Sequence, residues 1–159
     1  CHFTVGDCTT GRPSTYVFRY RVASFGTYGY ELDLSKCSQE DRATFKGYSQ
    51  LYRQDEALNL DGDLYRLLSP ETTDYCAYIK VSKDKKRAQF TFLEMYASGF
   101  VESMTLRLKG LDPQKLYRNE ETGEILHGAT LMNMGIRIND LYRKKREDGY
   151  TVWLSAVED

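Results

Sequence analysis

The sequence predicts an α+β fold in which a helical N-terminal part precedes a C-terminal part made of antiparallel strands. Apolar residues repeat at helical spacing in a segment near residue 45, and from residue 64 onward they alternate along short segments. Polar turns separate the alternating segments, as is typical of hairpins. The composition changes near Ser69-Pro70. We therefore expect a domain boundary there, with domains at residues 1–69 and 71–159.

The first expected helix follows a loop that starts at Gly11. Ser14 or Thr15 can cap its N-terminus, because a hydroxyl at this place accepts a bond from a free backbone N–H. The helix runs toward Phe25, and Gly26 is expected to end it.

The strongest helix signal begins at Ser38. This residue is a capping serine, and Asp41 three positions later approximates the partner of a capping box. The helix is expected to end near Asp55. Its apolar stripe consists of Phe45, Tyr48, Leu51 and Tyr52.

The C-terminal part is expected to contain strands and no convincing helix. Residues 75–81 and 88–95 alternate on either side of a polar turn and predict a β-hairpin. Further strands are expected at 64–68, at 104–108, from Tyr117, and at 150–157. Residues 130–138 are expected to be a short strand or a strand broken at Gly135.

Length and charge exclude several classes of protein. The chain has 159 residues, enough to bury a core but short of the roughly 250 residues of a complete (β/α)8 barrel. Lys and Arg total 22 against 23 Asp and Glu, which argues against a nucleic-acid binder. No apolar stretch approaches the ~18 residues of a membrane-spanning helix, so no membrane partner is expected. The 13 tyrosines suggest an aromatic face that is partly exposed to solvent.

The start of the chain and its cysteines bear on its origin. The sequence opens with Cys1 rather than Met and is interpreted as a processed product or a piece of a longer chain. The four cysteines form no C-x2-C pair, so neither a metal site nor a cofactor is expected. Cys1, His2, Asp7 and Cys8 could approach one another as ligands, but half-buried cysteines in a reducing compartment explain them better. With no N-x-[ST] acceptor, a cytoplasmic location is expected.

Other candidate groups have simpler structural explanations. His127 lies beside a glycine in a loop, where a surface role is favoured over catalysis. Asp61-Gly62-Asp63 could hold a cation but is more simply interpreted as a turn before a strand. The basic runs 83–87 and 143–146 could bind phosphate but are expected to be solvated turns. Glu120 and Glu121 have no visible apolar pocket to raise a pKa, and no catalytic residue is assigned.

Six segments in order resemble the C-terminal portion of the glycoside hydrolase family 36 α-galactosidases. Together they span nearly the whole chain. They are His2-Phe3-Thr4-Val5 with Thr10-Gly11-Arg12, the glycine-containing segment 25–34, the helix start Ser38-x-Glu40, the segment 62–70, residues 106–118 around Lys109-Gly110-Leu111-Asp112-Pro113, and Gly128-x-x-Leu131-Met132-Asn133-x-Gly135. The first loop departs from the family, because Gly6-Asp7-Cys8-Thr9 replaces a Pro-Asn-His-Gln segment.

The resemblance implies a retaining α-galactosidase that removes terminal α-galactosyl groups from melibiose- and raffinose-type sugars. Such a mechanism needs two carboxylates about 5–5.5 Å apart. The family's nucleophile lies in a Lys-Trp-Asp motif, whereas the single Trp here, Trp153, follows Val152. Both catalytic Asp residues are thus expected upstream of this chain, which alone is expected to be inactive.

The resemblance also implies a fold. Residues 1–69 would be the last strand and helices of a (β/α)8 barrel, and residues 71–159 a small antiparallel β-sandwich domain. The loop from Val5 to Arg12 would then be the part nearest the substrate, with His2 as the plausible pocket neighbour. The expected partners are the remainder of the barrel and the galactoside substrate, and a homo-oligomer remains open.

A second hypothesis remains open at this point. The chain could be a stand-alone, non-enzymatic β-sandwich module that binds carbohydrate or protein, because flat tyrosine rings stack on sugar faces. That hypothesis requires two or three exposed tyrosines side by side.

Overall fold

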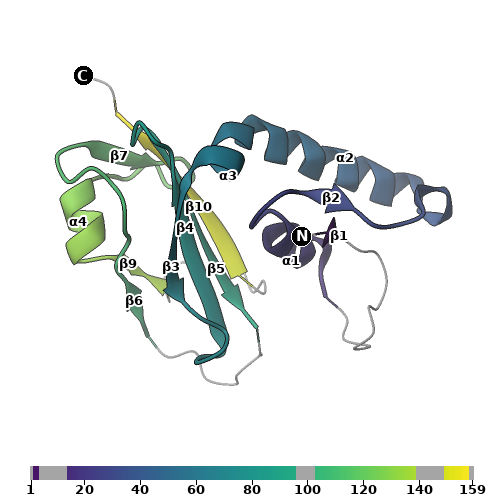
Figure 1. The fold of residues 1–159 in the computed structure, drawn as a ribbon, viewed down its shortest axis with the longest axis horizontal. Coiled ribbons are helices and arrows are strands. Elements are labelled where there is room, and N and C mark those ends of the chain that lie inside the picture. Colours follow the sequence, from purple (N-terminus) through teal and green to yellow (C-terminus); the bar gives the residue numbers. More distant parts are fainter. Residues whose placement is uncertain (1, 4–13, 96–102, 139–148, 158–159) are drawn as a thin grey trace. The chain divides into compact units, whose positions relative to one another are not determined.

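The computed structural model describes residues 2–3, 14–95, 103–138 and 149–157 (Figure 1). The chain divides into two compact units, Cys1–Leu60 and Asp61–Asp159. This division falls before the strand at 63–68, whereas the change in composition falls after it. The strand belongs to the sheet of the second unit, and the assignment of domains to 1–69 and 71–159 stays a prediction.

Local capping fixes the helices of the first unit. Thr15 caps α1 (Tyr16–Ala23) by accepting a hydrogen bond from the backbone N–H of Phe18 at 3.2 Å. Ser38 and Asp41 form a full capping box at the start of α2 (Gln39–Gln54). Both predicted helices are therefore confirmed, each within two residues of its expected end.

The remaining elements of this unit are short. A parallel pair joins β1 (His2–Phe3) to β2 (Gly29–Tyr30). A 3-10 turn, η1 (Leu34–Lys36), precedes α2, and α3 (Glu56–Asp61) follows it. The connection from β1 through α1 to β2 is a strand–helix–strand unit with parallel strands.

Aromatic side chains form the core of the first unit. Tyr20 stacks on Tyr48 with ring centroids 4.7 Å apart, and Tyr28 stacks on Tyr52 at 5.1 Å. The hydroxyl of Tyr52 donates to the carbonyl of Gly26 at 2.9 Å. Tyrosine suits this small core because the ring buries apolar area while the hydroxyl binds backbone carbonyls.

A six-stranded sheet organises the second unit. Its order is β3-β4-β5-β10-β7-β8, and every neighbouring pair is antiparallel. The strands are β3 (Asp63–Leu68), β4 (Tyr75–Val81), β5 (Arg87–Glu94), β7 (Leu116–Asn119), β8 (Ile125–His127) and β10 (Gly149–Ala156). The predicted antiparallel β structure and the predicted 75–95 hairpin are confirmed.

Register explains the core of this sheet. Ile79, Phe90 and Val152 lie opposite one another on β4, β5 and β10, and all three are fully buried. Alternate residues of one strand point to the same face, so a single register aligns the apolar sets of all three strands.

The second unit also contains a two-stranded sheet and a short helix. The sheet pairs β6 (Thr105–Leu106) with β9 (Ile136–Arg137), and the helix is α4 (Gly128–Asn133). The expected absence of helix after residue 71 is wrong, because residues 128–133 form α4. The strand expected at 130–138 is wrong for residues 130–133, but its part after Gly135 is the strand β9. Leu131 is the buried anchor of α4, and Gly135, at φ 83°, turns the chain into β9.

No described helix is long and apolar enough to cross a membrane.

Candidate functional site

The predicted pocket neighbour His2 lies in β1, where its backbone is paired with Gly29. The loop from Val5 to Arg12 and the cysteines Cys1 and Cys8 lie outside the described residues. Among the residues that the structure describes, no three His, Cys, Asp or Glu side chains gather as a metal site.

The carboxylate of Asp63 forms ion pairs with two lysines, so it does not serve as a ligand for a metal cation. Lys83 forms an ion pair with one of its carboxylate oxygens, and the Nζ of Lys85 lies 3.4 Å from the other. The hydrogen bond from Lys83 holds the pKa of Asp63 below its usual value. This carboxylate therefore fastens the start of β3 to the β4–β5 turn.

The first basic run, residues 83–87, is the β4–β5 turn that the sequence predicts. Arg87 pairs with Glu120 and donates to the hydroxyl of Ser155 at 3.1 Å. Burial alone would raise the pKa of Glu120, but hydrogen bonds from Ser155 and Arg87 outweigh burial and lower it. The second basic run, 143–146, lies outside the described residues.

The ionisation of the carboxyl groups does not favour acid catalysis in the described part of the chain. A general acid at neutral pH needs a raised pKa. Wherever the pKa of a described carboxyl is shifted, the shift is downward. These groups are Asp33, Asp41, Asp63, Asp84 and Glu120.

His127 is exposed at the N-cap position of α4, and its side chain makes no capping hydrogen bond. This agrees with the surface role expected for it.

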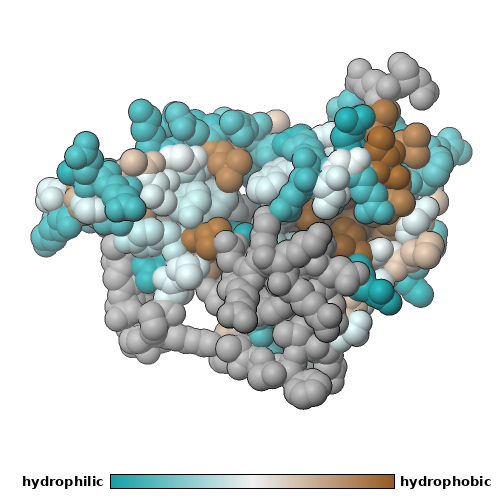
Figure 2. All heavy atoms as spheres, turned by 180° about the vertical axis from the view of Figure 1, so that it is seen from behind, coloured by the Kyte–Doolittle hydropathy of each residue, from teal (hydrophilic) through white to brown (hydrophobic). Residues whose placement is uncertain are grey.

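The tyrosines do not form an exposed platform in the part of the chain that the structure describes. Every tyrosine there is buried or half-buried. Figure 2 shows hydrophilic residues over most of the described surface on one face. The exposed large apolar residues are spread over several elements: Val22, Leu34, Leu60, Leu64, Ile125 and Met134. The described residues therefore show no partly solvent-exposed aromatic face. Nor do they show the tyrosine stacking surface that the second hypothesis requires.

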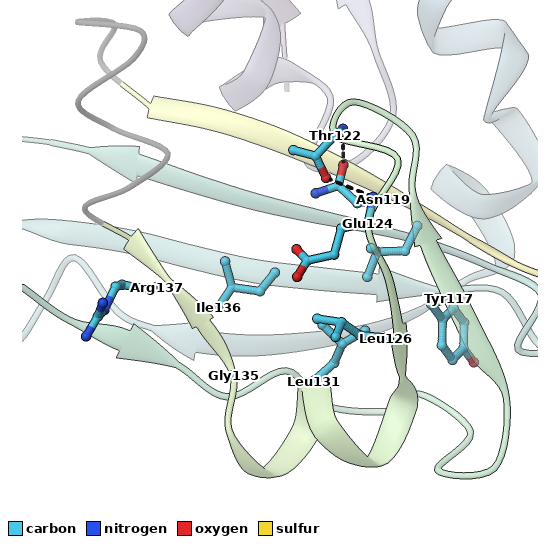
Figure 3. Close-up of a pocket in the computed structure, with 10 residues that line it drawn as sticks. Tyr117, Asn119, Thr122, Glu124, Leu126, Leu131, Gly135, Ile136 and Arg137 are labelled. Atoms are coloured by element: carbon cyan, nitrogen blue, oxygen red, sulfur yellow. Dashed lines mark hydrogen bonds between the residues drawn. The ribbon is translucent and has the colours of Figure 1, made fainter.

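Sequence reasoning missed a hollow of about 370 Å³ in the second unit (Figure 3). It lies between the β7–β8 hairpin and the α4–β9 segment. Ten residues line it: Tyr117, Asn119, Thr122, Glu124, Leu126, Leu131, Gly135, Ile136, Arg137 and Leu154. They come from four separate stretches of sequence, so no local motif marks the site.

The β7–β8 turn holds the polar wall of this hollow in a fixed conformation. The Oδ1 of Asn119 accepts from the backbone N–H of Glu121 at 2.9 Å and of Thr122 at 3.3 Å. The backbone N–H of Gly123, at φ 75°, donates to the carbonyl of Asn119 at 2.8 Å. The only available sequence signal was the turn Glu120-Glu121-Thr122-Gly123, which predicts the bend but not the hollow beside it.

Comparisons with known proteins identify the family. A family model for the glycosyl hydrolase family 36 C-terminal domain matches residues 75–154, which is half of the chain. The bifunctional α-galactosidase/sucrose kinase AgaSK of Mediterraneibacter gnavus is 32% identical over 127 residues, covering 80% of this chain and 14% of that protein. The probable α-galactosidase C of Aspergillus flavus is 33% identical over 134 residues, covering 84% of this chain and 18% of that protein.

The fold agrees with these relatives. A variant of the family 36 α-galactosidase AgaA from Geobacillus stearothermophilus, solved in complex with raffinose, superposes with a TM-score of 0.88 and 30% identity. The match covers 98% of this chain and 21% of the other. This chain thus spans between 14% and 18% of the length of the two sequence relatives. It belongs to glycosyl hydrolase family 36 and carries the C-terminal domain of that family.

Proposed function

We propose that this chain is the C-terminal portion of a retaining α-galactosidase that hydrolyses terminal α-galactosyl residues of melibiose- and raffinose-type sugars. The observation that carries the proposal is the family match at residues 75–154, together with relatives named as α-galactosidases of which the chain covers a small part. A raffinose complex of the relative AgaA supports the class of substrate.

The catalytic Asp residues belong, in this proposal, to the part of the enzyme upstream of this chain. Retention needs a nucleophilic carboxylate and an acid/base carboxyl about 5–5.5 Å apart. Hydrogen bonds hold the pKa values of Asp63 and Glu120 low, so neither suits the acid/base role. The domain described here then supports the catalytic part without entering the chemistry.

The N-terminal residues 1–69 are proposed to complete a (β/α)8 barrel. The parallel pairing of β1 with β2 around α1 supports this, because consecutive barrel strands are parallel and joined by helices. Residues 71–159 then form the β-sandwich domain that follows the barrel.

His2 is proposed as a neighbour of the substrate pocket. It lies in β1, and active sites of barrels lie at the C-terminal ends of their strands. The loop that follows β1 would approach the same pocket.

The stereochemistry of melibiose hydrolysis by the longer polypeptide that contains this chain tests the proposal. Proton NMR during the first minutes of reaction should show α-galactose as the first product, with β-galactose appearing later by mutarotation. An aryl β-galactoside should not be cleaved and serves as the control. Initial release of β-galactose, or no hydrolysis of melibiose, would contradict the proposal.

A further inference from the structure

The hollow beside the β7–β8 hairpin has two chemically different walls. Asn119, Thr122 and Glu124 form a polar wall, and all three belong to one hairpin. The opposite wall and floor are mostly aliphatic and come from Leu126, Leu131, Ile136 and Leu154. Arg137 also belongs to the lining, and Figure 3 shows its side chain directed away from Glu124. A site with two such walls fits a ligand that itself has one polar edge and one apolar face.

The polar wall offers hydrogen-bonding groups that the fold does not use. The carboxylate of Glu124 has no hydrogen bond or ion pair within the described residues, and Figure 3 shows it directed toward Ile136. Because the turn occupies the Oδ1 of Asn119, the Nδ2 amide is the group left to donate. The hydroxyl of Thr122 accepts from the backbone N–H of Glu124 at 3.3 Å and keeps its own proton to donate.

The aliphatic wall is rigid. Leu131 and Leu154 are 3% and 2% exposed and belong to the main core of this unit. Gly135 approaches the backbone of Leu106 so closely that an added Cβ would collide with its carbonyl oxygen. The wall that faces Glu124 therefore keeps its position without a ligand.

We infer that this hollow binds a neutral pyranoside. A carboxylate can accept from two vicinal hydroxyls at once, while an amide and a hydroxyl supply donors beside it. The C–H face of a sugar ring then packs on Ile136 and Leu126. Because the carboxylate of Glu124 faces Ile136 while the side chain of Arg137 points away from it, an anion is disfavoured between the two walls (Figure 3). A simple alkylammonium ion would leave the amide of Asn119 and the hydroxyl of Thr122 unpaired.

The size of the hollow agrees with this ligand class. Its volume of about 370 Å³ lies at the lower end of the range for small-molecule sites, which start near 300 Å³. It accommodates one or two sugar rings rather than a long chain. Since Glu124 is exposed to solvent, the expected affinity is weak, with Kd in the millimolar range.

The inference does not depend on the proposed hydrolase activity. The hollow would hold a sugar on the C-terminal domain. A binding assay on the 159-residue chain therefore tests it independently of any turnover by a longer enzyme.

The experiment is a ¹⁵N–¹H NMR titration of the full 159-residue chain with methyl α-galactoside, methyl α-glucoside and raffinose, each to 50 mM. At least one sugar should shift the backbone amide signals of residues 119–126 and 131–137 with one common Kd. Glu124→Gln should weaken that binding about tenfold. Glu121→Gln, on the same turn but outside the lining, should leave it unchanged.

Three results would overturn the inference. The first is the absence of saturable shifts in these two segments with all three sugars. The second is sugar binding that Glu124→Gln leaves intact. The third is saturable binding of n-butylammonium chloride at these amides without sugar binding, which would make the hollow a cation site.

Discussion

Two buried tyrosines in the second unit allow a matched test of what a buried hydroxyl contributes to stability. The hydroxyl of Tyr117 accepts from the backbone N–H of Asp112 at 3.0 Å and donates to the carbonyl of Lys85 at 2.8 Å. The hydroxyl of Tyr150 is buried and has no hydrogen-bond partner among the described residues. The two residues are 1% and 3% exposed, so both are shielded from solvent. We predict that Tyr→Phe has opposite effects at the two positions.

The magnitudes follow from the two sets of partners. Tyr117→Phe removes two hydrogen bonds of about 0.5–1.5 kcal/mol each and leaves the N–H of Asp112 without a partner, for a total loss of about 2 kcal/mol. Tyr150→Phe removes a hydroxyl whose unpaired burial costs about 1–3 kcal/mol, so the free energy of unfolding should rise by about 1 kcal/mol. The variants should differ by about 3 kcal/mol, a large share of the stability of a domain.

Urea unfolding followed by tryptophan fluorescence measures this difference. The single tryptophan, Trp153, lies in β10 and so reports on the unit that contains both substitutions. The midpoint should move down for Tyr117→Phe and up for Tyr150→Phe, with an unchanged m-value. Equal losses of stability in the two variants would refute the reasoning from hydrogen-bond partners.

Burial raises the pKa of Tyr150 above the ordinary value for tyrosine, so the unfolded chain releases this proton first and stability falls above about pH 10. Urea midpoints at pH 8 and pH 10.5 should show a smaller fall for Tyr150→Phe, and an equal fall would contradict this origin. Gly110→Ala should lose more than about 1 kcal/mol, because Gly110 has φ 79° and a Cβ there would enter the ring of Tyr65. Gly47→Ala, in open space on α2, should gain about 0.5–1 kcal/mol, and similar thermal shifts for both glycine variants would count against the argument. Ser38→Ala should cost the first unit about 1 kcal/mol by removing the capping box, while Ser38→Asp should retain most of that stability; circular dichroism during urea unfolding distinguishes them.

Much of the fold could be predicted because its signals are local. The capping box at Ser38 and the alternation along residues 75–95 each lie within one element, and the structure contains both elements. The helix α4 was missed because its six residues span less than two turns, too few for a helical period to show.

The hollow could not be predicted for a different reason. Its polar wall lies at residues 119–124 and its aliphatic wall includes Ile136 and Leu154. These stretches meet only through the pairing of β7 with β10 and the return of the chain from α4 to β9. The spacing of residues in the sequence does not predict that these stretches lie side by side. The resemblance to a family, by contrast, rested on motifs in a fixed order, and the family match confirmed it.

We propose that this chain belongs to an α-galactosidase whose catalytic carboxylates lie outside it. The most direct measurement is the turnover of an aryl α-galactoside by the 159-residue chain and by the longer polypeptide that contains it, at equal concentrations. We predict turnover by the longer polypeptide and none by the chain alone. Turnover by the isolated chain, or none by the longer polypeptide, would contradict it.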